Sequence, residues 1–213
     1  MRLFAIGLAA TALSLALGMA GPGATHPQRR SAGPGLGLST AAPEGDPFTL
    51  PAGVTLENPI LAYSPDDPIE CEEKYPEPEA RNGSAVALCL AFRNSTSAPI
   101  DVTLPPGLLF VSTSDKVQSG FLVQRLTIEV PPGVRYVSPL LLHCANIDRN
   151  TSTQRDEYTL GPIVQYKAFQ EFYALLEGKD VSGDEVALVQ LAINHLAEGE
   201  GLSASDREAI ESM

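Results

Sequence analysis

The residues with most chemical potential are His143 and Cys144, which end the apolar run SPLLLHC. A cysteine beside a histidine could be a nucleophile with its base, a metal ligand or an inert buried thiol. Adjacent residues on a strand point to opposite faces, so His143 cannot activate Cys144 directly. A Cys–His dyad would have to recruit His195 from further along the chain. We therefore expect Cys144 to pack as a small buried hydrophobe, and we predict no catalytic residues.

The other two cysteines, Cys71 and Cys89, are closer to each other along the chain than either is to Cys144. In an oxidising compartment, a disulfide between Cys71 and Cys89 is the natural inference. The spacing alone leaves open a bridge from either one to Cys144.

The start of the chain predicts secretion. A basic start, Met1-Arg2, is followed by the apolar run 3–17 and the small-x-small pattern Gly18-Met19-Ala20, which together indicate a cleaved signal peptide over residues 1–20. That run is shorter than the roughly 20 residues of a membrane-spanning helix, and no second apolar stretch reaches spanning length. We expect a secreted or periplasmic protein without a membrane span after cleavage. The Ala/Gly/Pro-rich composition is typical of a bacterial source.

Charge limits the partners. The chain has 14 Lys and Arg against 26 Asp and Glu, a formal net charge of −12. Nucleic acids and anionic membranes are bound by basic surfaces, so we expect neither as a partner. We expect the partner to be an unidentified protein or surface ligand.

Composition and periodicity divide the rest of the chain into three parts. Residues 21–46 are rich in Gly and Pro and predict a disordered linker. Residues 47–165 show short alternating strands broken by Pro and Gly, which favours an immunoglobulin-like antiparallel β-sandwich. Residues 166–213 have a helical period and predict two or three short helices that pack on the sandwich. The fold class expected is mainly β with an α appendage.

Two of those helices have start signals in the sequence. Capping-box patterns open them at Ser182 and Ser205, and Gly178 is a good end for the helix before them. Each helix is too short to be stable alone, so each must pack on other elements.

Cofactor motifs are absent from the sequence. It has no Walker A loop, no G-x-G-x-x-G, no H-E-x-x-H and no C-x-x-C, so we predict no cofactor and no metal site. The acidic cluster at residues 66–79 has oxygen ligands that Ca²⁺ prefers, but we expect a solvated surface loop.

Several short motifs, in order, resemble those of secreted bacterial β-domains. They are Arg93-Asn94-Ser95-Thr96, Pro106–Val111, His143–Asn146, Tyr158–Pro162 and the helical Val189–Asn194. A cysteine followed by Gln-x-Ala is also distantly similar to the thioester domains of bacterial surface adhesins, with their TQxA motif. That resemblance implies an internal thioester between Cys144 and the carboxamide of Gln190.

Gln190 has a second interpretation. It lies between Val186 and Ile193 on the apolar stripe of its helix, and a buried amide without a partner costs on the order of 1–3 kcal/mol. A main-chain group of residues 145–148 or the Cys144 thiol would satisfy it. We expect a non-enzymatic secreted binding or structural protein in which this amide ties the helix to the β-domain. The alternative is an adhesin-like module with the Cys144–Gln190 thioester.

Overall fold

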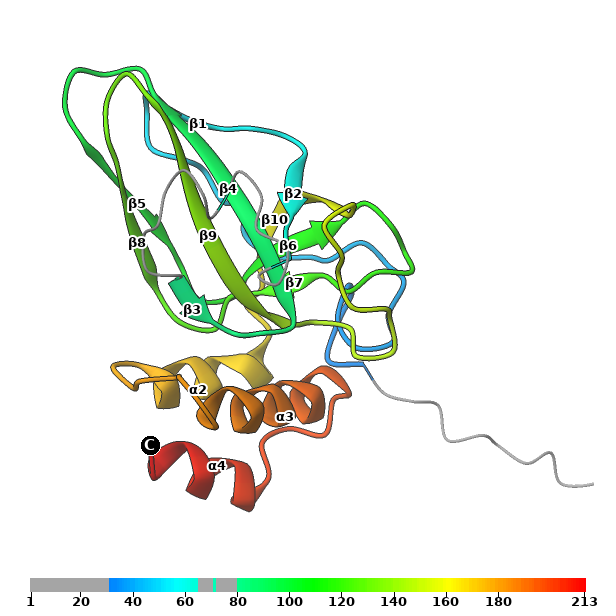
Figure 1. The fold of residues 1–213 in the computed structure, drawn as a ribbon. Helices are drawn as coiled ribbons and strands as arrows, with labels where there is room; N and C mark the ends of the chain where they lie inside the picture. Colours follow the sequence, from blue (N-terminus) through cyan, green and yellow to red (C-terminus); the bar gives the residue numbers. More distant parts are fainter. Residues whose placement is uncertain (1–30, 65–70, 72–79) are drawn as a thin grey trace, which may run out of the picture.

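The computed structural model describes residues 31–64, 71 and 80–213, and shows a β-barrel with helices at one end (Figure 1). The strands are β1 (Val54–Leu56), β2 (Ile60–Ala62), β3 (Ala80–Asn82), β4 (Val86–Asn94), β5 (Ile100–Leu104), β6 (Leu108–Ser112), β7 (Gly120–Phe121), β8 (Leu126–Val130), β9 (Arg135–Cys144) and β10 (Glu157–Ile163). The helices are α2 (Lys167–Leu176), α3 (Glu185–Ala197) and α4 (Ala204–Glu211).

The prediction of a β-sandwich is wrong, because the main sheet closes on itself. Its antiparallel order is β4-β2-β10-β6-β7-β9, and β9 pairs back with β4 from Val86↔Leu142 to Arg93↔Arg135. β1 adds to β4, β3 adds in parallel to β9, and β5 pairs with β8 in a separate small sheet. A sandwich and a barrel share the same alternation of inward and outward residues. Only the distant pairings, β4 with β9 and β2 with β10, distinguish them.

The barrel interior follows the predicted alternation. Val86, Leu88, Leu90 and Phe92 of β4 point inward and are fully buried with Leu140 and Leu142 of β9. The opposite face of β4 is also covered. Tyr63, Cys71, Ala87, Ala91 and Val137 form a separate small cluster there. β4 is therefore covered on both sides.

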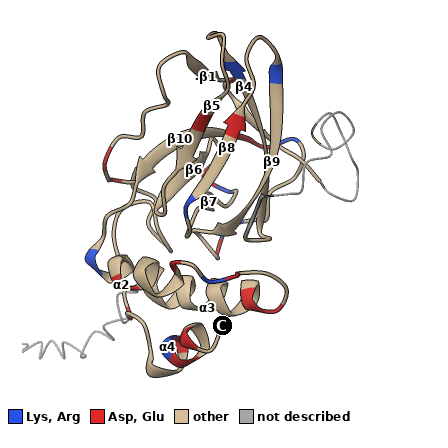
Figure 2. Ribbon diagram, turned by 90° about the vertical axis from the view of Figure 1, so that its left-hand side faces the viewer, with Lys and Arg blue, Asp and Glu red and all other residues tan. Residues whose placement is uncertain are grey.

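The helices form a helical layer below one end of the barrel, with α2 and α3 next to the strands and α4 beneath them (Figures 1 and 2). Outward-pointing Leu109 of β6 and Phe121 of β7 pack against it. Phe121 of β7 points outward and meets Phe169 of α2 edge to face, with ring centroids 5.3 Å apart. Phe169, Phe172 and Leu176 of α2 are buried, and their spacing of three and four residues fits the helical period expected from residue 166 onward. Aromatic packing therefore anchors the helical layer on the barrel wall.

The N-termini of α3 and α4 differ from the sequence signals. α3 begins after Asp184 without a side-chain cap, so the box expected at Ser182 does not form. α4 has a capping box, but Ser203 is its N-cap and Asp206 its partner, two residues before the expected one. Packing in the helical core stabilises both helices, and of the two only α4 is also stabilised by a side-chain cap at its N-terminus.

Residues 31–46 belong to the expected disordered linker, and here they pack on the helical layer. Leu36 is 1% exposed within the helical core, and Ala32 N donates to Ala197 O at 2.9 Å. Gly37 has a positive φ of 55°, and a Cβ there would stand 2.7 Å from Ala197 O. This close approach requires glycine.

Candidate functional site at the barrel–helix junction

The end of β9 has one paired edge and one open edge. On the first, β7 pairs with His143 and Cys144, and Ala145 N donates to Ser119 O at 2.9 Å. On the other, the pairing with β4 stops at Leu142, whose carbonyl accepts from Ala85 N at 3.0 Å. Alternate residues direct their N–H and C=O to the same edge, so those of Cys144 point past the start of β4. Without a partner there, both groups would be left unpaired.

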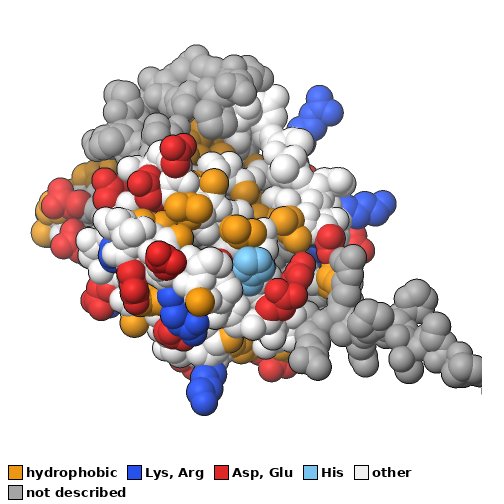
Figure 3. Space-filling view, turned by 90° about the horizontal axis from the view of Figure 1, so that it is seen from below, with side chains coloured by type: hydrophobic (Ala, Val, Ile, Leu, Met, Phe, Trp, Pro, Cys, Tyr) orange, Lys and Arg blue, Asp and Glu red, His pale blue; other side chains and the backbone are white. Residues whose placement is uncertain are grey.

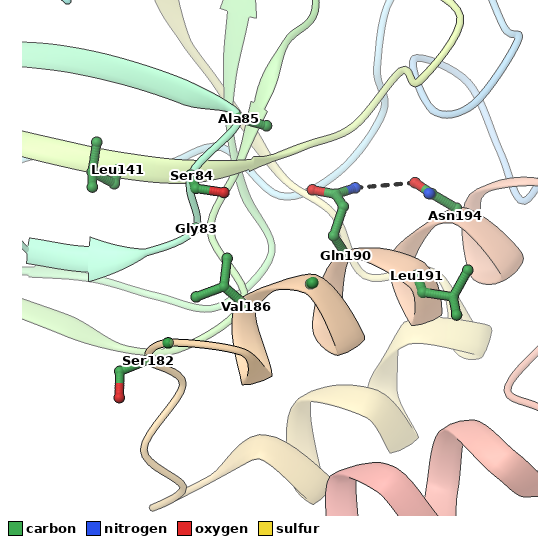
Figure 4. Close-up of a pocket in the computed structure, with 11 residues that line it drawn as sticks. Gly83, Ser84, Ala85, Leu141, Ser182, Val186, Gln190, Leu191 and Asn194 are labelled. Atoms are coloured by element: carbon green, nitrogen blue, oxygen red, sulfur yellow. Dashed lines mark hydrogen bonds between the residues drawn. The ribbon is translucent and has the colours of Figure 1, made fainter. Parts of the chain in front are cut away.

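Gln190 of α3 supplies that partner. Its Oε1 accepts from Cys144 N at 2.8 Å and its Nε2 donates to Cys144 O at 3.0 Å. The side-chain amide thus continues the ladder where β4 has not yet begun. The sequence predicted that the Gln190 amide would bond to a main-chain group of residues 145–148. Its partner is a main-chain group, but of Cys144, one residue before that range. The Nε2 also donates to Asn194 Oδ1 at 3.0 Å, which orients the carboxamide (Figure 4).

His143 is held neutral by its surroundings. Its Nδ1 lies 3.3 Å from Gln190 Oε1, and because that oxygen only accepts, Nδ1 carries the proton. The side chain is fully buried, and its Nε2 has no hydrogen-bond partner in the described structure. Burial lowers the pKa of His143 to about 4, and the bond to Gln190 only partly offsets it. His143 is therefore an uncharged donor to Gln190.

Cys144 is a free thiol that is 3% exposed. Its sulfur accepts from Asn146 N at 3.2 Å, on the other side of the strand from the His143 ring. Burial raises the pKa of the thiol to about 11, and the bond from Asn146 N opposes this only partly. The parity argument holds, because the two side chains contact different groups. The thiol is protonated at neutral pH, which disfavours a role as nucleophile.

The predicted thioester pair is brought together, but through the main chain of Cys144. The Gln190 carboxamide bonds to the N–H and C=O of Cys144, whereas the sulfur bonds to Asn146 N. His195, the other candidate base, lies at the α3–α4 contact with Nδ1 3.0 Å from Asp206 Oδ2. Burial disfavours the Asp206 carboxylate, but the bonds from His195 and Ser203 outweigh it and lower its pKa. Gln190 and His195 thus each form hydrogen bonds that hold α3 against its neighbours, Gln190 to the barrel and His195 to α4.

A groove lies beside Gln190, between α3 and the barrel, with a volume of about 580 Å³. Figure 4 shows Gln190 reaching from α3 toward the barrel, with Ser84 and Leu141 on the facing wall. The lining comprises Gly83, Ser84, Ala85 and Leu141 of the barrel, Ser182 and Gly183 of the preceding loop, and Val186, Ala187, Gln190, Leu191 and Asn194 of α3. Most of these side chains are small or apolar, as in many ligand-binding sites.

The outer face of α3 continues this groove with apolar side chains that sequence reasoning missed. Leu188 and Leu191 are 43% and 49% exposed, and Ala187 beside them is exposed as well. The sequence does indicate this apolar face, because α3 has no Lys, Arg, Asp or Glu between Glu185 and Glu198. Figure 3 looks onto the helical layer and shows apolar side chains around an exposed histidine, with acidic side chains near them. A helix that is apolar on nearly every side is normally covered.

The remaining site predictions have separate outcomes. The Cys71–Cys89 disulfide is confirmed, with Cα atoms 5.6 Å apart. The signal peptide and the acidic cluster at 66–79 lie outside the described residues, apart from Cys71 itself. Among the described residues, no group of three His, Cys, Asp or Glu side chains is placed to hold a metal ion. In that same part of the chain, no helix has the length and apolar character needed to cross a membrane.

Comparison of the chain with protein-family models, with curated proteins and with solved structures finds no match.

Proposed function

We propose that this chain is a secreted, non-enzymatic binding protein whose binding surface is the α3 face. We define the α3 face as the groove beside Gln190 together with Ala187, Leu188 and Leu191. The observation that carries the proposal is the pair of half-exposed leucines, Leu188 and Leu191, on a helix that has no Lys, Arg, Asp or Glu after its first residue, Glu185. Apolar patches next to a groove on a soluble protein mark interaction sites. Secretion is supported by the signal-like residues 1–20 and by the disulfide.

Selection from a random peptide library on the immobilised protein tests the surface without assuming a ligand. We expect selected peptides to lose at least about tenfold in affinity for Leu191→Ser, which removes an exposed apolar contact. The matched control is Leu61→Ser, because Leu61 on β2 is also 49% exposed but is outside the α3 face. Peptides that bind both variants equally well would refute the proposal.

A Cys144–Gln190 thioester is the second candidate, favoured by the contact between the two residues. It would require the amide to leave both main-chain groups of Cys144 and a protonated, buried thiol to react. Its product loses one ammonia, so the intact mass of the protein tests it directly.

A further inference from the structure

α3 differs from the other two helices in the residues that it exposes. α2 and α4 carry charged side chains on their outer faces, such as Glu171 and Arg207, which pair across the two helices at 2.7 Å. α3 carries no Lys or Arg, and its exposed side chains include Ala187, Leu188 and Leu191. Exposure of these apolar side chains to water is unfavourable, so burying them against a partner would lower the free energy.

The surroundings of the α3 face are acidic. Residues 166–213 contain ten Asp and Glu but only three Lys and Arg, a larger excess of acid than in the rest of the chain. Glu185 and Glu198 stand at the two ends of α3 itself. Figure 3 shows acidic side chains on several sides of the apolar patch. An apolar strip framed by negative charge is complementary to an apolar strip framed by positive charge.

The same charge argues against a second copy of this chain as the occupant. A symmetric dimer through the α3 face would bring two acidic helical layers together, and like charges that face each other oppose association. The partner must therefore differ from this chain in charge.

From this combination we infer that the α3 face binds a cationic amphipathic segment of another protein. Its apolar residues cover Leu188 and Leu191 and place one side chain in the groove, while its Lys or Arg residues face the acidic helical layer. Helices bind apolar grooves in this way in many complexes. The inference rests on the proposed function above and adds the chemistry of the partner.

Two synthetic peptides test the inference on the whole mature protein. One is an amphipathic helix with Leu on one side and Lys on the other; the second has Glu at each Lys position. We expect the Lys peptide to bind at least about tenfold more tightly and to weaken as salt is added, because salt screens exposed charges. Leu191→Ser should weaken the Lys peptide by about tenfold or more, and Leu61→Ser should not.

A charge variant adds a matched comparison. Glu198→Lys at the end of α3 should weaken the Lys peptide by several-fold, whereas Glu129→Lys, exposed on β8, should leave it unchanged. Equal binding of the Lys and Glu peptides would overturn the inference, as would a dimer that Leu191→Ser abolishes. Library peptides that depend on Leu191 but carry no positive charge would refute the cationic partner and leave the proposed binding surface standing. Ligands that are indifferent to Leu191 would refute both.

Discussion

Replacing Gln190 by leucine is the most informative perturbation of the barrel–helix junction. Leucine preserves the apolar part of the side chain but removes the carboxamide that pairs with Cys144 N and Cys144 O. Each main-chain group that loses its partner costs about 1–3 kcal/mol when it stays buried. Because Gln190 itself is only part-buried, water can reach the vacated edge, so we expect a total loss of about 2–3 kcal/mol of unfolding free energy.

Urea unfolding of the two leucine variants Gln190→Leu and Gln170→Leu measures this cost. Gln170 lies exposed on α2 and bonds only to Gln165 among the hydrogen bonds that we describe, so its replacement should change the unfolding free energy by less than about 0.5 kcal/mol. The midpoint for Gln190→Leu should fall with the m-value unchanged. Equal midpoints for the two variants would refute the role of Gln190 as the partner of the open β9 edge.

Gln190→Glu is a second check on the same geometry. A carboxylate oxygen in place of Nε2 would face the Cys144 carbonyl, which it cannot bond, and protonation restores a donor. This variant should therefore be least stable at neutral pH and recover part of the loss as the pH falls. A variant whose deficit does not depend on pH would contradict the assigned orientation of the amide.

Four further predictions follow from the structure. Removing the disulfide with paired Cys71→Ser and Cys89→Ser substitutions should cost about 3 kcal/mol in thermal or urea unfolding, since the bridge closes a loop with a sequence separation of 18; an unchanged stability would contradict this. The pKa of His143 is about 4 in the folded protein, because of burial, and 6.5 in the unfolded chain. As the pH falls, the unfolded chain therefore takes up this proton before the folded protein does. Stability should therefore fall as the pH drops from about 6.5 to about 4, by on the order of 3 kcal/mol, and His143→Phe should flatten this slope. Cys144, with its pKa raised to about 11, should resist iodoacetamide at pH near 8 in the folded protein and react once urea unfolds it; rapid labelling of the folded protein would show that the thiol is accessible. Asp206→Ala should cost about 1 kcal/mol through the lost capping box, a difference present above pH 4 or so and lost in acid as Asp206 takes up its proton.

The sequence predicted local features of the fold well. Alternation predicted short strands within residues 47–165, and the helical period predicted two or three short helices within residues 166–213. The pairing of Cys71 with Cys89 followed from chain proximity. These features depend on residues that are close together in the chain or share one repeating pattern.

Closure of the barrel was beyond the sequence because it depends on pairings between distant strands. β7 has only two residues, Gly120 and Phe121, and its pairing with β9 has no periodic signal. The role of Gln190 was predictable in kind, because a half-buried amide needs partners. Its actual partner depends on where β4 begins relative to the end of β9, which no local pattern shows.

The sequence could have predicted the proposed binding surface if the exposed side of α3 had been considered as well as its buried side. The stripe of α3 was sought on its buried side, where Val189, Ile193 and Leu196 pack. The unusual feature is the other side, where a solvent-facing helix would normally carry Lys or Glu and α3 has Leu188 and Leu191.

The central claim is that the intact carboxamide of Gln190 joins the helical layer to the barrel through the main chain of Cys144, whose thiol stays free. Intact-mass measurement of the mature protein, unfolded in the presence of iodoacetamide without reductant, tests it most directly. We predict the mass calculated with one disulfide and one alkyl group on Cys144. A mass lower by one ammonia, with no alkylation of Cys144, would show a thioester and contradict the account.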